Sequence, residues 1–346
     1  MSSYTVASHY NAVKQTGIEE RKNSRIFHLR NINNWMKSCL INGAVDMLRK
    51  EGMREPRILD LACGKGGDLR KWSIARAKSV VMADLAGVSV DQAKGRHEEM
   101  RAREGNGIFP AQFITVDCCN NDLLPLIDPS FLPIDLVSCQ FAFHYSFVNE
   151  SSARTMLRNA VSSLREGGLF IGTLPDAERI VWTARTSGNS DNKWENGVCS
   201  VHYDSSTPLD NPPLFGAKFH FSLDEQVNCP EFLAYFPLLV KLAEEEGMEL
   251  VWEKRFPDAC QQYLSNAESR SLLYKMSGLK IVPTEKEGKE EEEYMHVVDE
   301  MNGASASVVG KGKVNAKRPT TFAGHNFEVG VGCLLYVYRI LFQKED

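Results

Sequence analysis

A glycine-rich turn that follows a short apolar run is the part of this sequence best suited to binding a ligand. It reads LDLACGKGGD over residues 59–68. Gly64, Gly66 and Gly67 let the backbone pass close to a ligand at points where a Cβ would collide with it. The acidic residue precedes the glycines, and the G-x-G-x-x-G spacing that binds a pyrophosphate at a helix N-terminus is absent. The turn therefore favours a ligand without phosphates.

Single polar residues follow the next three apolar runs of the chain. Asp84 comes about twenty residues after the turn, where an acidic side chain can accept hydrogen bonds from the two hydroxyls of a ribose. Asp117 could accept from the exocyclic amine of adenine, and Gln140 ends the fourth run. A single strand-end Asp is about as often only a helix cap or a turn residue. Together the three predict a nucleoside site, because the carboxyl ends of parallel strands meet at one edge of a sheet.

Aromatic side chains crowd the segment that follows the fourth run: Phe141, Phe143, His144, Tyr145 and Phe147. Aromatic rings at such a place can stack on a purine, at ~1–3 kcal/mol per stacked base. Core packing explains the three phenylalanines more simply. His144 and Tyr145 are better candidates for ligand contact, since their polar tips need partners.

The elements that must position these residues alternate between strands and helices. Helical periodicity over residues 91–103 and 152–164 separates five short apolar runs, and it also extends over residues 19–50. This alternation predicts a doubly wound, parallel α/β sheet. Further along, we expect a helix at 231–246 and a strand at 249–254. The five runs expected to be strands are 57–61, 79–83, 112–116, 135–139 and 168–172.

Composition excludes several classes of protein. A net charge of −5 argues against a protein that holds long nucleic acids by phosphate neutralisation, although residues 1–110 carry 19 Lys+Arg against 12 Asp+Glu. The nine cysteines include no C-x-x-C pair, so we expect reduced thiols and no metal site. The sequence contains neither a signal peptide nor a run of eighteen apolar residues, and we expect an intracellular protein without membrane contact.

Longer strings of the sequence are specific enough to indicate a family. They are VASHYN (6–11), SRIFHLRNINNWMK (24–37), LDLACGKGGDL (59–69), QFAFHYSF (140–147), PLFG (213–216) and PEFLAYFPLL (230–239). With them the chain resembles the eukaryotic mRNA cap guanine-N7 methyltransferases over most of its length, except roughly residues 180–210 and 280–330. The resemblance implies S-adenosylmethionine as methyl donor, 5′-capped pre-mRNA as substrate, and a nuclear location. It also makes other capping enzymes, the transcribing polymerase or a small activating subunit possible partners.

The resemblance also implies a domain organisation. We expect a single Rossmann-like methyltransferase domain over residues 1–346, with N-terminal helices and an inserted subdomain for the cap. Its parts are a helical segment (1–50), a cofactor-binding core (55–180), an insertion over the active site (181–247), a mobile loop (284–325) and a closing strand (333–342).

Two sets of site residues follow from matching these strings to the family. Contacts to the methyl donor are implied for Lys37, Ala62, Gly64, Asp84, Asp117, Cys118, Gln140 and Tyr145. Contacts to the cap are implied for Asn33, Asn34, Lys65, Lys71, Arg96, His144, Glu231 and Tyr336.

Three positions need separate comment. Ala62 stands where the family usually has glycine, which is tolerable only if its φ is negative. In the final strand Tyr336 is the first choice for a cap contact and Tyr338, on the same face, the second. Glu231 alone would be interpreted as an ordinary helix-start residue after Pro230. Only the resemblance makes it a guanine-binding carboxylate.

The implied chemistry needs no catalytic base, because guanine N7 already carries a lone pair. Tyr145, His144 and Glu231 would position the reactants, and a carboxylate at the Watson–Crick edge would select guanine. Lys65, Lys71 and Arg96 could line one rim and neutralise the triphosphate bridge. The alternatives are a methyltransferase for another RNA base or a small metabolite, and an inactive cap-binding scaffold.

Overall fold

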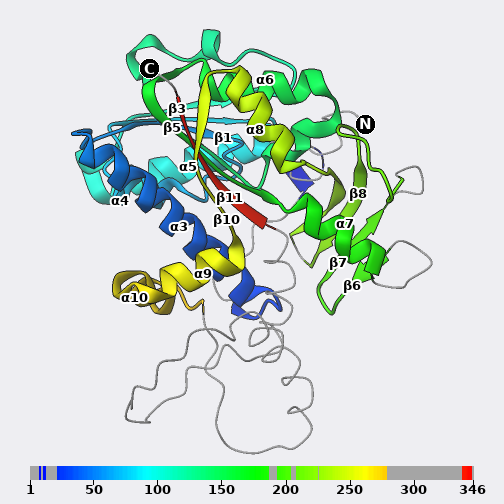
Figure 1. The fold of residues 1–346 in the computed structure, drawn as a ribbon. Coiled ribbons are helices and arrows are strands. Elements are labelled where there is room, and N and C mark those ends of the chain that lie inside the picture. Colours follow the sequence, from blue (N-terminus) through cyan, green and yellow to red (C-terminus); the bar gives the residue numbers. More distant parts are fainter. Residues whose placement is uncertain are drawn as a thin grey trace, which may run out of the picture.

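A seven-stranded sheet forms the centre of the computed structural model, which describes residues 8, 11, 12, 22–186, 193–203, 208–224, 226–278 and 337–344 (Figure 1). Its strands are β1 (Arg57–Leu61), β2 (Ser79–Asp84), β3 (Ala111–Thr115), β4 (Ile134–Gln140), β5 (Leu164–Pro175), β10 (Met248–Arg255) and β11 (Val337–Lys344). They lie in the order β10-β11-β5-β4-β1-β2-β3. Strands β1 to β5 pair in parallel, and β11 runs antiparallel between β5 and β10. The expected doubly wound α/β fold is confirmed.

Helices connect these strands and cover the sheet. The α-helices are α3 (Phe27–Lys50), α4 (Leu69–Ile74), α5 (Gly87–Glu104), α6 (Glu150–Val161), α7 (Ala177–Thr186), α8 (Phe236–Glu245), α9 (Phe256–Ser265) and α10 (Ala267–Lys275). Short 3-10 helices are η1 (Gly105–Gly107), η2 (Leu124–Leu126), η3 (Pro129–Phe131) and η4 (Phe143–Val148).

Side chains alternate between two apolar layers, one on each face of the sheet. On one face Leu59, Val81 and Val137 pack with residues of α6 and α8. On the other face Ile58, Val80 and further residues pack with α3 and α4. Burial on both faces explains why apolar residues dominate β1, β2 and β4, although Asp60, Asp135 and Ser138 are buried among them.

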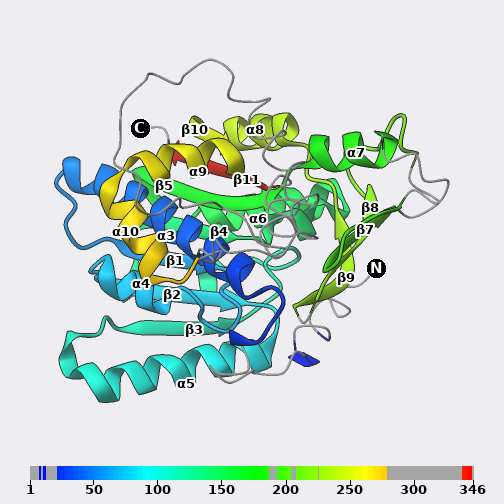
Figure 2. The same ribbon diagram turned by 90° about the horizontal axis from the view of Figure 1, so that it is seen from below.

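A second, antiparallel sheet of four strands stands beside the first (Figures 1 and 2). It is made of β6 (Lys193–Glu195), β7 (Cys199–Tyr203), β8 (Lys218–Leu223) and β9 (Val227–Phe232), in that order. One face packs against α7 through Tyr203 and Phe219, and against α3 through Cys199 and Leu223. Strand β9 also contacts η4, which follows the carboxyl end of β4. The second sheet is therefore attached at the carboxyl-end edge of the first.

The predicted helix at 231–246 was wrong at its beginning. Residues 227–232 form β9, which pairs with β8, so that Glu231 lies opposite Phe219. Helix α8 begins only at Phe236, and Pro237 occupies its first turn, where proline costs no hydrogen bond. Pairing with a distant strand overrides the local helical pattern here. The expected loop at 284–325 lies outside the described residues.

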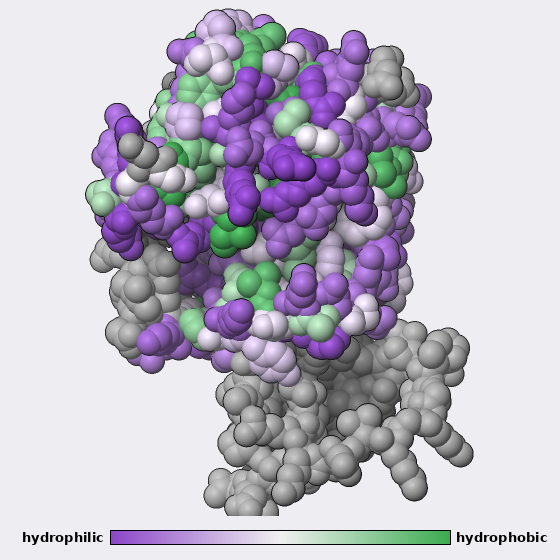
Figure 3. Space-filling model, turned by 90° about the vertical axis from the view of Figure 1, so that its left-hand side faces the viewer, coloured by the Kyte–Doolittle hydropathy of each residue, from purple (hydrophilic) through white to green (hydrophobic). Residues whose placement is uncertain are grey.

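Hydrophilic side chains dominate the face of the molecule seen in Figure 3, and the apolar areas on it are small and separate. Ile74 of α4 is an exposed apolar residue, with 64% of its surface accessible. Among the described residues no helix has both the length and the apolar character needed to span a bilayer.

Candidate active site

The strand order reverses between β1 and β4, and ligands of doubly wound sheets bind at the carboxyl ends of the strands at such a switch point. Leu61 and Cys139 are register partners, so these two strands end side by side. The residues just beyond, Ala62 and Phe141, both adopt positive φ, at 58° and 59°. Ala62 therefore does not meet the condition of a negative φ under which alanine was considered tolerable at this position. Such backbone strain is found preferentially at functional sites.

The glycine turn and Asp84 hold each other in place. The backbone N–H of Gly64 donates to Oδ2 of Asp84 at 2.8 Å, and that of Ala86 donates to Oδ1 at 2.8 Å. Burial raises the pKa of Asp84. A Cβ on Gly66 would come within 2.7 Å of Leu69, whereas one on Gly64 would meet nothing within 4 Å. Gly66 is thus required for packing, whereas Gly64 faces open space.

The loop after β3 carries Asp117 and Cys118. Asp117 accepts from the backbone N–H of Cys119 at 3.0 Å through Oδ1 and from the Asn120 amide at 2.7 Å through Oδ2. Each oxygen therefore keeps a lone pair for a further donor. The Cys118 thiol is buried, and burial raises its pKa far above the ordinary value, so it stays a neutral thiol.

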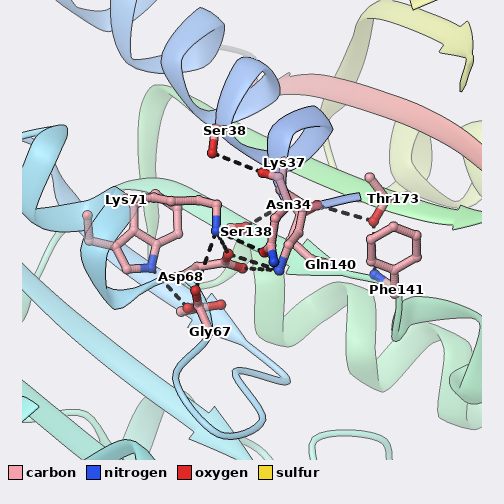
Figure 4. A network of polar contacts seen from close by, with 12 residues as sticks. Asn34, Lys37, Ser38, Gly67, Asp68, Lys71, Ser138, Gln140, Phe141 and Thr173 are labelled. Carbon is pink, nitrogen blue, oxygen red and sulfur yellow. Dashed lines mark hydrogen bonds and ion pairs between the residues drawn. The ribbon is translucent and has the colours of Figure 1, made fainter. Parts of the chain in front are cut away.

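Gln140 is fixed at the end of β4 by two hydroxyls. Its amide nitrogen donates to Ser138 Oγ at 3.0 Å, and its Oε1 accepts from Thr173 Oγ1 at 3.1 Å (Figure 4). Thr173 Oγ1 also accepts from the backbone N–H of Phe141 at 3.0 Å. The backbone of Phe141 and the side chain of Gln140 thus share Thr173 of β5 as a hydrogen-bond partner.

A buried group of charges joins α3 to the glycine turn (Figure 4). Asp68 lies 2.9 Å from the ammonium of Lys37 and 2.6 Å from that of Lys71. Although burial raises the pKa of Asp68, the two lysines lower it to about 2. Behind it, Asp60 accepts from the Trp72 indole at 2.9 Å, and burial followed by repulsion from Asp68 raises its pKa to about 7. We refer to these charged residues, Lys37, Asp60, Asp68 and Lys71, as the charge cluster.

Sequence reasoning missed Asp60 and Asp68 as site residues, although both lie in the quoted LDLACGKGGDL string. It also placed Lys71 on a rim together with Lys65 and Arg96. The structure instead directs the Lys71 ammonium to Asp68 and, at 3.3 Å, to Oδ1 of Asn34, with 11% of the side chain exposed. Burial lowers the pKa of Lys71.

The remaining expected contacts on these elements are half-buried. Lys65 lies in the glycine turn and Arg96 on α5. Asn33 lies on α3, and its side-chain oxygen has no hydrogen-bond partner among the described residues.

Glu231 forms a second polar group with two residues of η4. Tyr145 donates from its hydroxyl to Oε1 of Glu231 at 3.1 Å, and Nε2 of His144 lies 3.1 Å from Oε2. Glu231 is 5% and His144 2% exposed, so both are removed from bulk water. The Cys229 thiol lies 3.5 Å from the Tyr145 hydroxyl, and burial raises its pKa to about 11. We refer to Glu231, His144 and Tyr145 as the carboxylate group.

Tyr336 lies outside the described residues, so its contact with the cap stays a prediction. The second choice, Tyr338, lies on β11, opposite Leu174 of β5 and Arg255 of β10. Strand β11 begins at Val337 and ends at Lys344, whereas the expected closing strand was 333–342. Among the described residues, no group of three or more His, Cys, Asp or Glu side chains could hold a metal ion.

The doubly wound sheet, the glycine turn without a pyrophosphate pattern and the strand-end carboxylates define a Rossmann-like methyltransferase. The model of the mRNA (guanine-N(7))-methyltransferase domain matches residues 2–311. The chain belongs to this family, and its activity is methylation of the mRNA cap at guanine N7.

Three relatives named mRNA cap guanine-N(7) methyltransferase support this assignment. The Caenorhabditis elegans protein is 55% identical over 298 residues, which are 85% of this chain and 77% of its own length. The Drosophila melanogaster protein is 40% identical over 303 residues, 86% and 70% of the two chains. The Schizosaccharomyces pombe protein is 35% identical over 281 residues, 81% and 75% of the two chains.

Proposed function

We propose that the strand-end residues bind S-adenosylmethionine and that the carboxylate group binds the guanine of the cap. The observation that supports this division is the 3.1 Å hydrogen bond from Tyr145 to Glu231. Tyr145 lies five residues after Gln140, which ends β4 at the switch point. The chain thus brings an acidic side chain from the second sheet next to the edge of the first sheet where a nucleoside fits.

On the donor side, Asp84 would accept from the two ribose hydroxyls, and the loop at Asp117 and Cys118 would contact the adenine. Gly64 leaves the open space that such a ligand needs. The Lys37 ammonium, held by Asp68 at the end of the turn, suits the carboxylate of the donor's amino-acid end. When bound, S-adenosylmethionine supplies an electrophilic methyl group on a sulfonium.

On the cap side, Glu231 would accept from N1–H and the 2-amino group of guanine. Adenine offers no donor at N1 and no 2-amino group, so it would leave a buried carboxylate unpaired. Tyr145 and His144 hold the carboxylate in one orientation before guanine arrives. Low exposure strengthens the hydrogen bond from Tyr145.

The reaction asks the chain to position two reactants, since N7 needs no deprotonation. Positioning of this kind supplies ~7–11 kcal/mol of barrier lowering. The purine gains positive charge as N7 is methylated, and the negative charge of Glu231 would stabilise it. Asn33, Asn34, Lys65 and Arg96 would contact the remainder of the cap, while Lys71 would hold Asp68 and Asn34 in place.

The test is methyl transfer to RNA ending in GpppA, compared with RNA ending in IpppA. Inosine retains N7 and N1–H but lacks the 2-amino group, so kcat/KM should fall ~10–100-fold through loss of one hydrogen bond to a charged group. Digestion of the product should release m7GpppA. Transfer to another atom, or equal rates on both RNAs, would show that the guanine edge does not face Glu231.

We extend the proposal to the setting of the reaction. A substrate with a newly made 5′ cap would suit an enzyme that acts in the nucleus on pre-mRNA, with other capping enzymes, the polymerase or a small activating subunit as partners. Family membership supports this setting. Fluorescence microscopy of the tagged chain would test the location, and exclusion from the nucleus would contradict it.

A further inference from the structure

The loop that follows β3 is held by a single buried side chain of α6, Asn159. Only 3% of this residue is exposed. Its amide nitrogen donates to the carbonyl oxygens of Cys118 and Asn121, both at 2.8 Å. Its Oδ1 accepts from the backbone N–H of Leu123, also at 2.8 Å. One side chain therefore closes the loop over residues 118–123 from its two ends.

These bonds extend through one peptide group to the carboxylate of Asp117. Asn159 fixes the carbonyl of Cys118, and the planar peptide fixes the direction of the N–H of Cys119. That N–H donates to Oδ1 of Asp117 at 3.0 Å. A displacement of the Cys118 carbonyl would therefore be transmitted to the Asp117 carboxylate.

We propose that Asn159 is a positioning residue for the adenine of the methyl donor. It holds Asp117 where the carboxylate accepts from the exocyclic amine, and so contributes to the discrimination between adenine and hypoxanthine, which carries a carbonyl oxygen at that position. The inference rests on the proposed donor site, in which Asp117 and Cys118 face the adenine.

Only an amide satisfies all three loop groups at this position. An Asp would place an oxygen against the two carbonyls, whose lone pairs would repel it. A Ser is too short to bridge all three groups. Helix α6 offers a matched control, because Asn149 caps its N-terminus by accepting from the N–H of Ser152 at 2.8 Å. Asn149→Ala weakens the same helix without removing a bond to the loop.

The experiment measures binding of S-adenosylhomocysteine and S-inosylhomocysteine by calorimetry. The preference for the adenosyl ligand is the dissociation constant of S-inosylhomocysteine divided by that of S-adenosylhomocysteine. For Asn159→Asp and Asn159→Ser, this preference should fall at least fivefold. The KM for S-adenosylmethionine should rise while kcat at saturating donor stays within twofold. Asn149→Ala should lower the melting temperature and leave the preference within twofold. Binding of GpppA to each variant shows that the measured protein is folded. If Asn159→Asp does not fold, Asn159→Ser alone provides the test.

Asp117→Ala separates the two ways in which the inference could fail. If Asp117→Ala leaves the preference unchanged, the adenine lies elsewhere and the donor site itself is wrong. If Asp117→Ala lowers the preference but the Asn159 variants keep it, the donor site stands and the role of Asn159 is overturned. A loss of preference in the Asn149→Ala control equal to that in the Asn159 variants would also overturn it, since general weakening of α6 would then be the cause.

Discussion

The hydroxyl of Tyr145 donates a hydrogen bond to Oε1 of Glu231 at 3.1 Å, although the two residues are 86 positions apart in the chain. Tyr145 belongs to the segment after β4 of the large sheet, and Glu231 belongs to β9 of the small one. The bond therefore joins the two sheets at the place where we propose that donor and cap meet. A change at either end should affect catalysis more than folding.

Replacement of Glu231 by Gln should lower kcat/KM on GpppA-ended RNA ~100-fold or more, since it removes a charge-assisted acceptor and the charge that stabilises a cationic purine. Gln has nearly the same volume and still accepts from Tyr145, so the free energy of unfolding should change by less than ~1 kcal/mol. Steady-state kinetics measure kcat/KM, and urea unfolding measures the free energy of unfolding. Glu195→Gln on the exposed side of β6 is the control and should leave turnover unchanged. Near-normal turnover of the Glu231→Gln variant on capped RNA would show that Glu231 does not bind guanine.

A double-mutant cycle tests whether Tyr145 acts through Glu231. Tyr145→Phe removes the hydroxyl that orients the carboxylate. If the two side chains act as a unit, the combined variant should lose less than the sum of the single losses in kcat/KM, with a coupling of ~0.5–3 kcal/mol. Strict additivity would mean that the hydrogen bond has no part in the reaction.

Asp84→Ala should abolish measurable donor binding. The carboxylate is proposed to bind two ribose hydroxyls, and each bond to a charged group contributes ~1.5–3 kcal/mol. Because the change also leaves the N–H groups of Gly64 and Ala86 without their acceptor, Asp84→Asn should be measured beside it. Asp91→Ala, on the exposed side of α5, is the matched control. Calorimetric titration with S-adenosylhomocysteine gives the affinities, and an unchanged dissociation constant for both Asp84 variants would remove Asp84 from the site.

The charge cluster should give stability an unusual dependence on pH. The pKa of Asp60 is raised to about 7, so between about pH 4 and pH 7 the folded state binds more protons than the unfolded state, and this contribution to stability is lost as pH rises through 7. The pKa of Asp68 is lowered to about 2, so its contribution is present above pH 4 and is lost as pH falls toward 2. Together the pair stabilises the fold most near pH 4.

Asp60→Asn removes the first of these two effects. Its free energy of unfolding should vary less between pH 4 and pH 8 than that of the wild type, by at most about 4 kcal/mol. Urea unfolding at a series of pH values measures this difference. Parallel curves for the two proteins over that range would mean that Asp60 titrates normally.

A structural feature could be predicted from the sequence when residues close together in the chain determine it, and not when it depends on contacts between distant residues. Strand β4 was recognised because apolar residues dominate the buried run from Ile134 to Cys139, in which Asp135 and Ser138 are the polar exceptions, and because Gln140 marks its end. Glu231 was selected as a site residue only through the resemblance to the family, and the strand that carries it was not predicted, because pairing with β8 depends on distant residues. Asp68 was missed for the same reason: its partner Lys37 comes from α3, and nothing in the turn itself signals that contact.

Ala62→Gly should stabilise the protein, because it relieves strain in the backbone of this residue. Ala62 has a φ of 58°, a conformation that costs a non-glycine residue ~1–2 kcal/mol. Glycine removes this strain but adds ~0.4–1 kcal/mol of unfolded-state entropy, so the free energy of unfolding should rise by ~0.5–1 kcal/mol. Arg76→Gly, at an exposed residue with a φ of 56°, should stabilise the protein by a similar amount. Both variants should keep the affinity for S-adenosylhomocysteine within about threefold, because the side chains that they remove are not proposed to contact the ligand. Urea unfolding decides the point, because a loss of stability in Ala62→Gly would mean that the methyl group of Ala62 packs well enough to outweigh the strain.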